Sequence, residues 1–95
     1  MNYFKIRDEI NEEKYSEIGF EKLPSPYNSI EYIYSYKRHG LNYPILSIRK
    51  DKNSEMGNRT YPYLIFSYVD STISLNLQRE VFYDMITLGW IEKAN

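Results

Sequence analysis

The side chains best suited to acid–base chemistry are one histidine and a set of glutamates. His39 is the only histidine in the chain and lies between Arg38 and Gly40, in a stretch typical of a turn. A general base has to lie within hydrogen-bonding reach of the proton that it removes, and the sequence suggests no serine or cysteine nucleophile beside His39. We therefore interpret His39 as a solvated turn residue.

The glutamates near the N-terminus fit a solvated helix face better than a catalytic pair. They recur at helical spacing, as Glu9, Glu12, Glu13, Glu17 and Glu21. An acid/base pair needs two carboxylates in unequal environments, which one exposed face does not provide. A helix with this charge could instead occupy a positively charged groove that normally receives phosphates.

Two absences in the sequence limit the chemistry further. The four glycines are isolated from one another, so there is no glycine-rich phosphate-binding loop. The chain has no cysteine, which excludes disulfides, thiol nucleophiles and cysteine-rich zinc sites. The sequence thus predicts a protein that is not an enzyme and that holds no metal and no cofactor.

A basic, tyrosine-rich segment in the middle of the chain offers binding to a nucleic acid as an alternative function. Residues 37–59 carry six Lys/Arg against two Asp/Glu, whereas residues 1–36 and 60–95 are acidic. Aromatic rings that stack on bases, beside cations that contact phosphates, are typical of single-strand binding. The contact residues of this alternative are Tyr36, Lys37, Arg38, Arg49 and Lys50. Two features weaken it: these cations form two clusters roughly 25 Å apart in an extended hairpin, and the net charge of the chain is −1.

Two helices are predicted, one near each end of the chain. Residues 8–18 form the first, which Gly19 ends in a left-handed cap. The second helix begins at Ser74 as its cap, and Leu88-Gly89-Trp90 ends it in the same way. Its apolar face contains Leu77, Val81, Met85 and Leu88.

Three strands are predicted between these helices, over residues 30–37, 45–50 and 63–69. The first shows the two-residue alternation of a strand, and prolines precede the other two. We therefore predict an α+β fold in which a three-stranded antiparallel sheet, a meander, is flanked by an N-terminal and a C-terminal helix in the order α-β-β-β-α. At 95 residues the chain forms a single domain, residues 1–95, because two cores would each be too small.

One face of this sheet is predicted to be a protein interface. Two helices can cover only one face, and the other face would be unusually apolar for solvent. The interface residues of this prediction are Ile33, Ile45, Tyr63 and Ile65. The surface would serve a homodimer, formed through this face or an edge strand, or a different protein partner. The other interpretation is that strands simply favour tyrosine and isoleucine.

The sequence also indicates a cellular location. The N-terminus is charged too early to contain the apolar stretch of a signal peptide, and no run approaches the roughly 20 apolar residues of a membrane span. We therefore expect a cytoplasmic protein without a membrane partner.

Two stretches of the chain resemble small uncharacterised phage and prophage proteins of Gram-positive bacteria. These are residues 16–22 with the following Ile30-Glu31-Tyr32, and the closing segment from Ser74 through Leu88-Gly89-Trp90-Ile91. Gln78 departs from the pattern, which has leucine there. The resemblance implies an accessory protein of a mobile element in the host cytoplasm, such as an inhibitor of a bacterial defence effector of the anti-CRISPR kind. It assigns no functional residues.

Taken together, these observations predict a non-enzymatic protein-binding module of phage or prophage type. It would be a stoichiometric inhibitor that occludes a surface of a host effector. The alternative is a small nucleic-acid-binding protein that uses the basic, tyrosine-rich segment.

Overall fold

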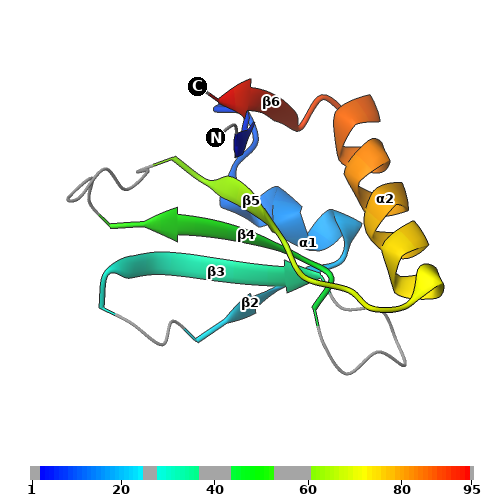
Figure 1. Ribbon diagram of the computed structural model, residues 1–95. Coiled ribbons are helices and arrows are strands. Elements are labelled where there is room, and N and C mark those ends of the chain that lie inside the picture. Colours follow the sequence, from blue (N-terminus) through cyan, green and yellow to red (C-terminus); the bar gives the residue numbers. More distant parts are fainter. Residues whose placement is uncertain (1–2, 25–27, 37–43, 53–60, 95) are drawn as a thin grey trace.

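The fold is a six-stranded antiparallel sheet with one short and one longer helix. The computed structural model describes residues 3–24, 28–36, 44–52 and 61–94. Within these residues the strands lie in the order β2-β3-β4-β5-β1-β6 (Figure 1). The strands are β1 (Tyr3–Ile6), β2 (Phe20–Leu23), β3 (Ile30–Tyr36), β4 (Leu46–Asp51), β5 (Tyr63–Phe66) and β6 (Ile91–Ala94). The helical elements are η1 (Glu12–Lys14), α1 (Tyr15–Ile18) and α2 (Thr72–Thr87).

The predicted three-stranded sheet flanked by two helices is therefore wrong. Its strands are present as β3, β4 and β5, and they pair consecutively as an antiparallel meander. The sheet continues on both sides, however: β2 pairs with β3, and β1 and β6 extend the other edge. The added strands have only four residues each, and their partners are distant in the sequence or follow a loop, so local periodicity gives a weak signal for them.

The predicted first helix is shorter than expected. Residues before Glu12 are not helical: β1 ends at Ile6, and Asp8 and Glu9 form a turn in which the Ile10 amide donates to the Arg7 carbonyl at 3.0 Å. The Ile6 amide donates to the carbonyl of Pro62 at 2.9 Å, and the Arg7 amide donates to the carbonyl of Trp90 at 2.8 Å. Gly19 ends α1 with a φ of 124°, which confirms the predicted left-handed position.

The longer helix, α2, begins and ends with standard caps. Its N-cap is Ser71, whose hydroxyl accepts a hydrogen bond from the Ser74 amide, so Ser74 lies in the first turn and is not the cap itself. At the other end Gly89 has a φ of 74°. The amides of Gly89 and Trp90 donate to the carbonyls of Ile86 and Met85, the paired hydrogen bonds of a Schellman motif. The predicted glycine cap is confirmed.

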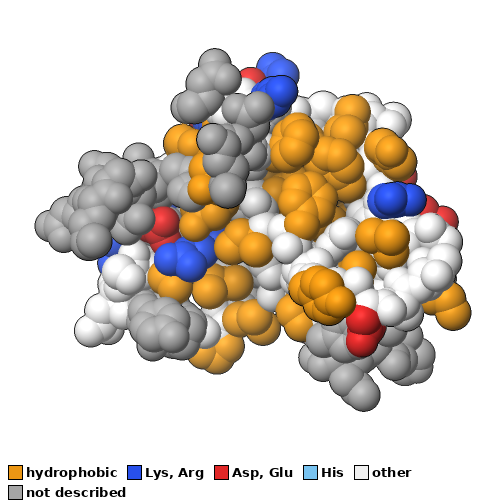
Figure 2. Space-filling model, in the orientation of Figure 1, with side chains coloured by type: hydrophobic (Ala, Val, Ile, Leu, Met, Phe, Trp, Pro, Cys, Tyr) orange, Lys and Arg blue, Asp and Glu red, His pale blue; other side chains and the backbone are white. Residues whose placement is uncertain are grey.

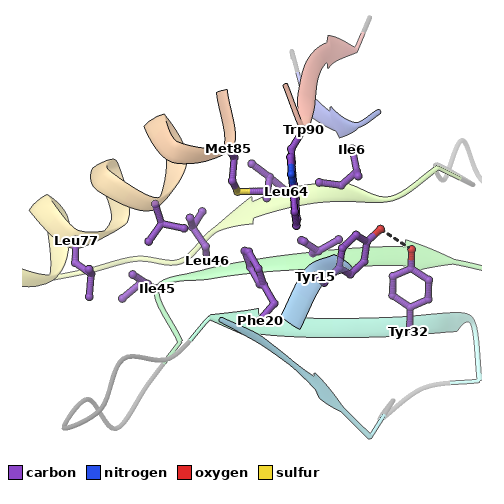
Figure 3. Packing of buried hydrophobic residues seen from close by; sticks show 12 residues of the cluster. Ile6, Tyr15, Phe20, Tyr32, Ile45, Leu46, Leu64, Leu77, Met85 and Trp90 are labelled. Atoms are coloured by element: carbon purple, nitrogen blue, oxygen red, sulfur yellow. Dashed lines mark hydrogen bonds between the residues drawn. The ribbon is translucent and has the colours of Figure 1, made fainter. Parts of the chain in front are cut away.

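One face of the sheet carries the hydrophobic core. Cross-strand pairing places Tyr34, Ile48 and Leu64 in one row on this face. Tyr15 of α1 and Met85 of α2 are buried against it, together with Trp90 (Figure 3). The short helix lies behind β4 and β5 in Figure 1, and α2 lies across the end of these strands. No described helix covers the opposite face, which we call the open sheet face. Of the helices in the described ranges, none is long and apolar enough to cross a membrane.

Candidate functional site

The open sheet face is less apolar than the sequence suggested. Its two central rows are Ile33–Arg49–Tyr63 and Ser35–Ser47–Ile65. The hydroxyls of Ser35 and Ser47 lie 3.2 Å apart and make the middle of the second row polar. Figure 2 looks onto this face.

The four predicted interface residues do not form one exposed surface. Ile65 is 37% exposed, Ile33 is half-buried and Tyr63 is buried. Ile45 does not lie on the open sheet face. Its exposure is 0%, and it packs in the core beside Leu77 (Figure 3). The reason is that β4 begins at Leu46, so the two-residue alternation does not extend back to Ile45.

The residues of the nucleic-acid alternative are also separated. Lys37 and Arg38 lie outside the described residues, as does His39. Arg49 and Lys50 are neighbours in β4 and so point to opposite faces of the sheet. Each of these cations is paired with a carboxylate, Arg49 with Asp51 at 2.8 Å and Lys50 with Glu31 at 2.9 Å. The Tyr36 ring packs edge-on against Phe20, with 5.6 Å between ring centroids.

Of the other described cations, some form ion pairs with carboxylates and some form none. Lys5 and Arg7 both approach Glu92, and they pair more closely with Asp8 and Glu9. Lys22 pairs with Glu12 at 3.3 Å. The cations that form no ion pair with any described residue are Lys14, Lys52, Arg79 and Lys93. Only these four have a charge that no described carboxylate neutralises at contact distance.

A cluster of tyrosines lies on the covered side of the sheet. The hydroxyls of Tyr15 and Tyr32 are 3.0 Å apart, and the Tyr34 hydroxyl donates to Glu12 at 2.7 Å. Burial raises the pKa of Tyr15 and Tyr32, and it also raises the pKa of Tyr34 together with the hydrogen bond to Glu12. The same hydrogen bond lowers the pKa of Glu12. These hydroxyls therefore stay protonated at neutral pH. The Tyr34 hydroxyl joins the sheet to η1 as a donor, and the hydrogen bond between Tyr15 and Tyr32 joins it to α1.

An exposed aromatic cluster lies where the sequence did not place a site. The rings of Phe4, Phe66 and Phe82 contact one another edge to face, with centroid separations of 6.3, 5.0 and 5.1 Å. Tyr83 and Ile86 of α2 lie beside them on the helix surface. We call these five residues the aromatic patch. In Figure 2 hydrophobic side chains gather over the space between β5, the β1–β6 pair and α2.

The aromatic patch is only partly buried by the fold. Phe66 is 43%, Tyr83 60% and Ile86 47% exposed. Phe82 and Phe4 are half-buried and pack against the edge of the core. One feature of the sequence indicates the aromatic patch. A second apolar stripe on α2, formed by Leu75, Phe82 and Ile86, lies beside the buried stripe of Leu77, Val81 and Met85. The position of Phe4 beside this stripe had no local signal, because it depends on the placement of β1.

One shallow hollow lies between α1 and the end of α2. Its volume is about 400 Å³, and it is lined by Glu17, Ile18, Asp84, Thr87 and Leu88. Both carboxylates are exposed to solvent. Within the described ranges no group of three or more histidine, cysteine or acidic side chains could hold a metal ion.

No family model, no curated protein and no solved structure matches this chain.

Proposed function

We propose that this protein is a non-enzymatic protein-binding module and that the aromatic patch is its binding surface. The observation that carries the proposal is the exposure of Phe66, Tyr83 and Ile86 beside a preformed contact of three phenylalanine rings. Aromatic residues are enriched at protein interfaces because each supplies a large, rigid contact area. A contiguous apolar patch on a small protein is typically used for binding.

The requirements of the fold do not account for this exposure. The core contacts of α2 come from Leu77, Val81 and Met85, which are buried on one side of the helix. Tyr83 and Ile86 lie outside this buried stripe and add little to it. Replacing exposed apolar residues with polar ones would cost a monomer little stability. Their presence is therefore better explained by a partner that covers them.

The resemblance to phage and prophage proteins supports a class of partner. A stoichiometric inhibitor of a bacterial defence effector acts by covering a surface of its target, so it needs a docking patch and no catalytic group. In this proposal the protein works in the host cytoplasm, where such effectors act. An edge strand, β2 or β6, offers a second contact in the same complex, since each edge has backbone groups that can pair with a strand of a partner.

The test compares two identical substitutions on one helix. Ile86→Asp places a charge in the aromatic patch, whereas Ile73→Asp places it at a residue that is 79% exposed near the start of α2, outside the patch. Immobilised wild type and both variants are incubated with a bacterial lysate, and retained proteins are quantified by mass spectrometry. We expect a protein that wild type and Ile73→Asp retain and Ile86→Asp loses.

Other outcomes of this experiment decide against the proposal. Equal retention by all three baits would show that the aromatic patch is not the binding surface. Loss of a nucleic acid in place of a protein from the Ile86→Asp bait would support the nucleic-acid alternative, whose affinity should fall steeply with salt. Concentration-dependent self-association that Ile86→Asp abolishes would assign the patch to a homodimer.

A further inference from the structure

Two unpaired cations flank the aromatic patch. Arg79 lies one helical turn before Phe82 and Tyr83, so its side chain is a neighbour of both on the surface of α2. Lys93 of β6 is the direct cross-strand partner of Phe4 and lies on the same face of the sheet. Neither cation forms an ion pair with a residue in the described part of the chain.

The nearest acidic residues are directed elsewhere. Helical spacing places Asp84 on the other flank of α2, where it lines the hollow shared with Glu17. Glu80 lies one turn before Tyr83 and borders it on the side away from Phe82 and Ile86. Glu92 points to the opposite side of β6 from Lys93 and approaches Lys5 and Arg7. The edge of the aromatic patch is thus locally basic on a chain whose net charge is −1.

From this charge distribution we infer that the occupant of the aromatic patch is an acidic segment of another protein. Its apolar side chains would pack on Phe66 and Ile86, and its carboxylates would pair with Arg79 and Lys93. Complementary charges at the rim of an interface select the partner and speed association. The inference rests on the proposed function and specifies the chemistry of the partner segment.

Two other occupants fit the charges less well. In a symmetric dimer built on this patch, Arg79 and Lys93 of one copy would approach the same cations of the other, which disfavours association. An anionic membrane is typically recognised by clusters of about four to eight basic residues, whereas two cations of the described ranges flank this patch.

A library of random short peptides, displayed and selected on the whole protein, tests the inference without a known ligand. The selected peptides are then synthesised, and their affinities are measured for wild type, for the double variant Arg79→Glu/Lys93→Glu and for the matched variant Lys14→Glu/Lys52→Glu. The matched variant reverses two cations that are also exposed and unpaired within the described ranges but lie away from the patch. All four positions are partly or fully exposed, so each variant is expected to fold.

We expect selected peptides that combine aromatic or aliphatic residues with an excess of Asp and Glu. Their affinity for Arg79→Glu/Lys93→Glu should be about tenfold weaker than for wild type at low salt, and that for the matched variant much less affected. Binding should also be lost in Ile86→Asp. The difference between the two double variants should shrink at high salt, since screening acts on exposed charges.

Several results would overturn the inference. They are selected peptides without an acidic excess, equal affinity for both double variants, or no peptide that distinguishes wild type from Ile86→Asp. Binding to phosphatidylserine vesicles that requires Arg79 and Lys93 would make a membrane the occupant instead. If the acidic peptides fail while Ile86→Asp still loses a lysate protein, the proposed function stands and only the partner chemistry is wrong.

Discussion

The side-chain amide of Gln78 joins α2 to the ends of two strands. Its nitrogen donates to the carbonyl of Ile45 at 2.7 Å and to the carbonyl of Ser67 at 2.9 Å. The Ser67 amide also donates to the Ile45 carbonyl, at 3.2 Å, so the three residues extend the β4–β5 pairing beyond the strands. Gln78 is buried, and the resemblance had suggested leucine at this position. A leucine could not satisfy these two carbonyls.

Gln78→Leu should therefore lower the free energy of unfolding. A buried polar group that loses its partner costs about 1–3 kcal/mol, and Ser67 loses its donor in this variant. Urea denaturation monitored by circular dichroism would measure the change. Asn76→Leu, an exposed substitution on the same helix, should stay within about 0.5 kcal/mol of wild type. An unchanged midpoint for Gln78→Leu would mean that water satisfies both carbonyls equally well.

The two positive-φ glycines should respond differently to alanine. Both substitutions force a left-handed conformation on a residue with a side chain, at a cost of roughly 1–2 kcal/mol. At Gly19 the new Cβ would also lie 2.8 Å from the ring of Tyr36, whereas at Gly89 it would meet no atom within 4 Å. We expect Gly19→Ala to be the more destabilising of the two. The same denaturation assay compares them directly, and equal losses would show that Tyr36 moves aside without cost.

These glycines also show which parts of the fold the sequence could predict. The caps at Gly19 and Gly89 and the β3–β4–β5 meander were predicted because their signals are local: a glycine after a helix, or alternation within one strand. Within β4, Ile48 lies between Ser47 and Arg49, the local alternation that the prediction of this strand used.

The parts that the sequence did not predict depend on distant pairing. β1 and β6 come from opposite ends of the chain, with Tyr3 paired to Ala94, and neither four-residue strand is periodic enough to be recognised alone. The aromatic patch follows from this placement, because Phe4 reaches Phe82 only when β1 lies between β5 and β6. The sequence does not show that Phe4 lies beside Phe66. Phe66 therefore looks like an ordinary core residue when the sequence is considered alone.

The buried tyrosines predict a loss of stability in alkali. Because the pKa values of Tyr15, Tyr32 and Tyr34 are raised by folding, their contribution is fully present below the unfolded value of about 10 and is lost as the pH rises above it. The free energy of unfolding should fall above about pH 10. Tyr32→Phe should show a smaller fall, because it removes one of the buried hydroxyls.

Tyrosinate absorbance and circular dichroism, recorded together through the alkaline range, test this prediction. Part of the tyrosinate signal should appear only as the far-ultraviolet signal of the fold is lost. Tyr68→Phe, at a highly exposed ring, controls for the loss of a hydroxyl as such. Complete ionisation of all tyrosines with the fold intact would contradict the burial of this cluster.

The three rings of the aromatic patch should stabilise one another in the free protein. Phe82 contacts both Phe4 and Phe66, at 5.0 and 5.1 Å, and is more buried than Phe66. Phe82→Ala should therefore cost more stability than Phe66→Ala. In a double-mutant cycle the Phe66–Phe82 pair should show a coupling of about 0.5–1.5 kcal/mol, the range for edge-to-face aromatic pairs. A coupling of zero would mean that the rings are not held in this arrangement before a partner binds. A measurable coupling would show that the patch is formed in advance, which reduces the ordering cost of binding.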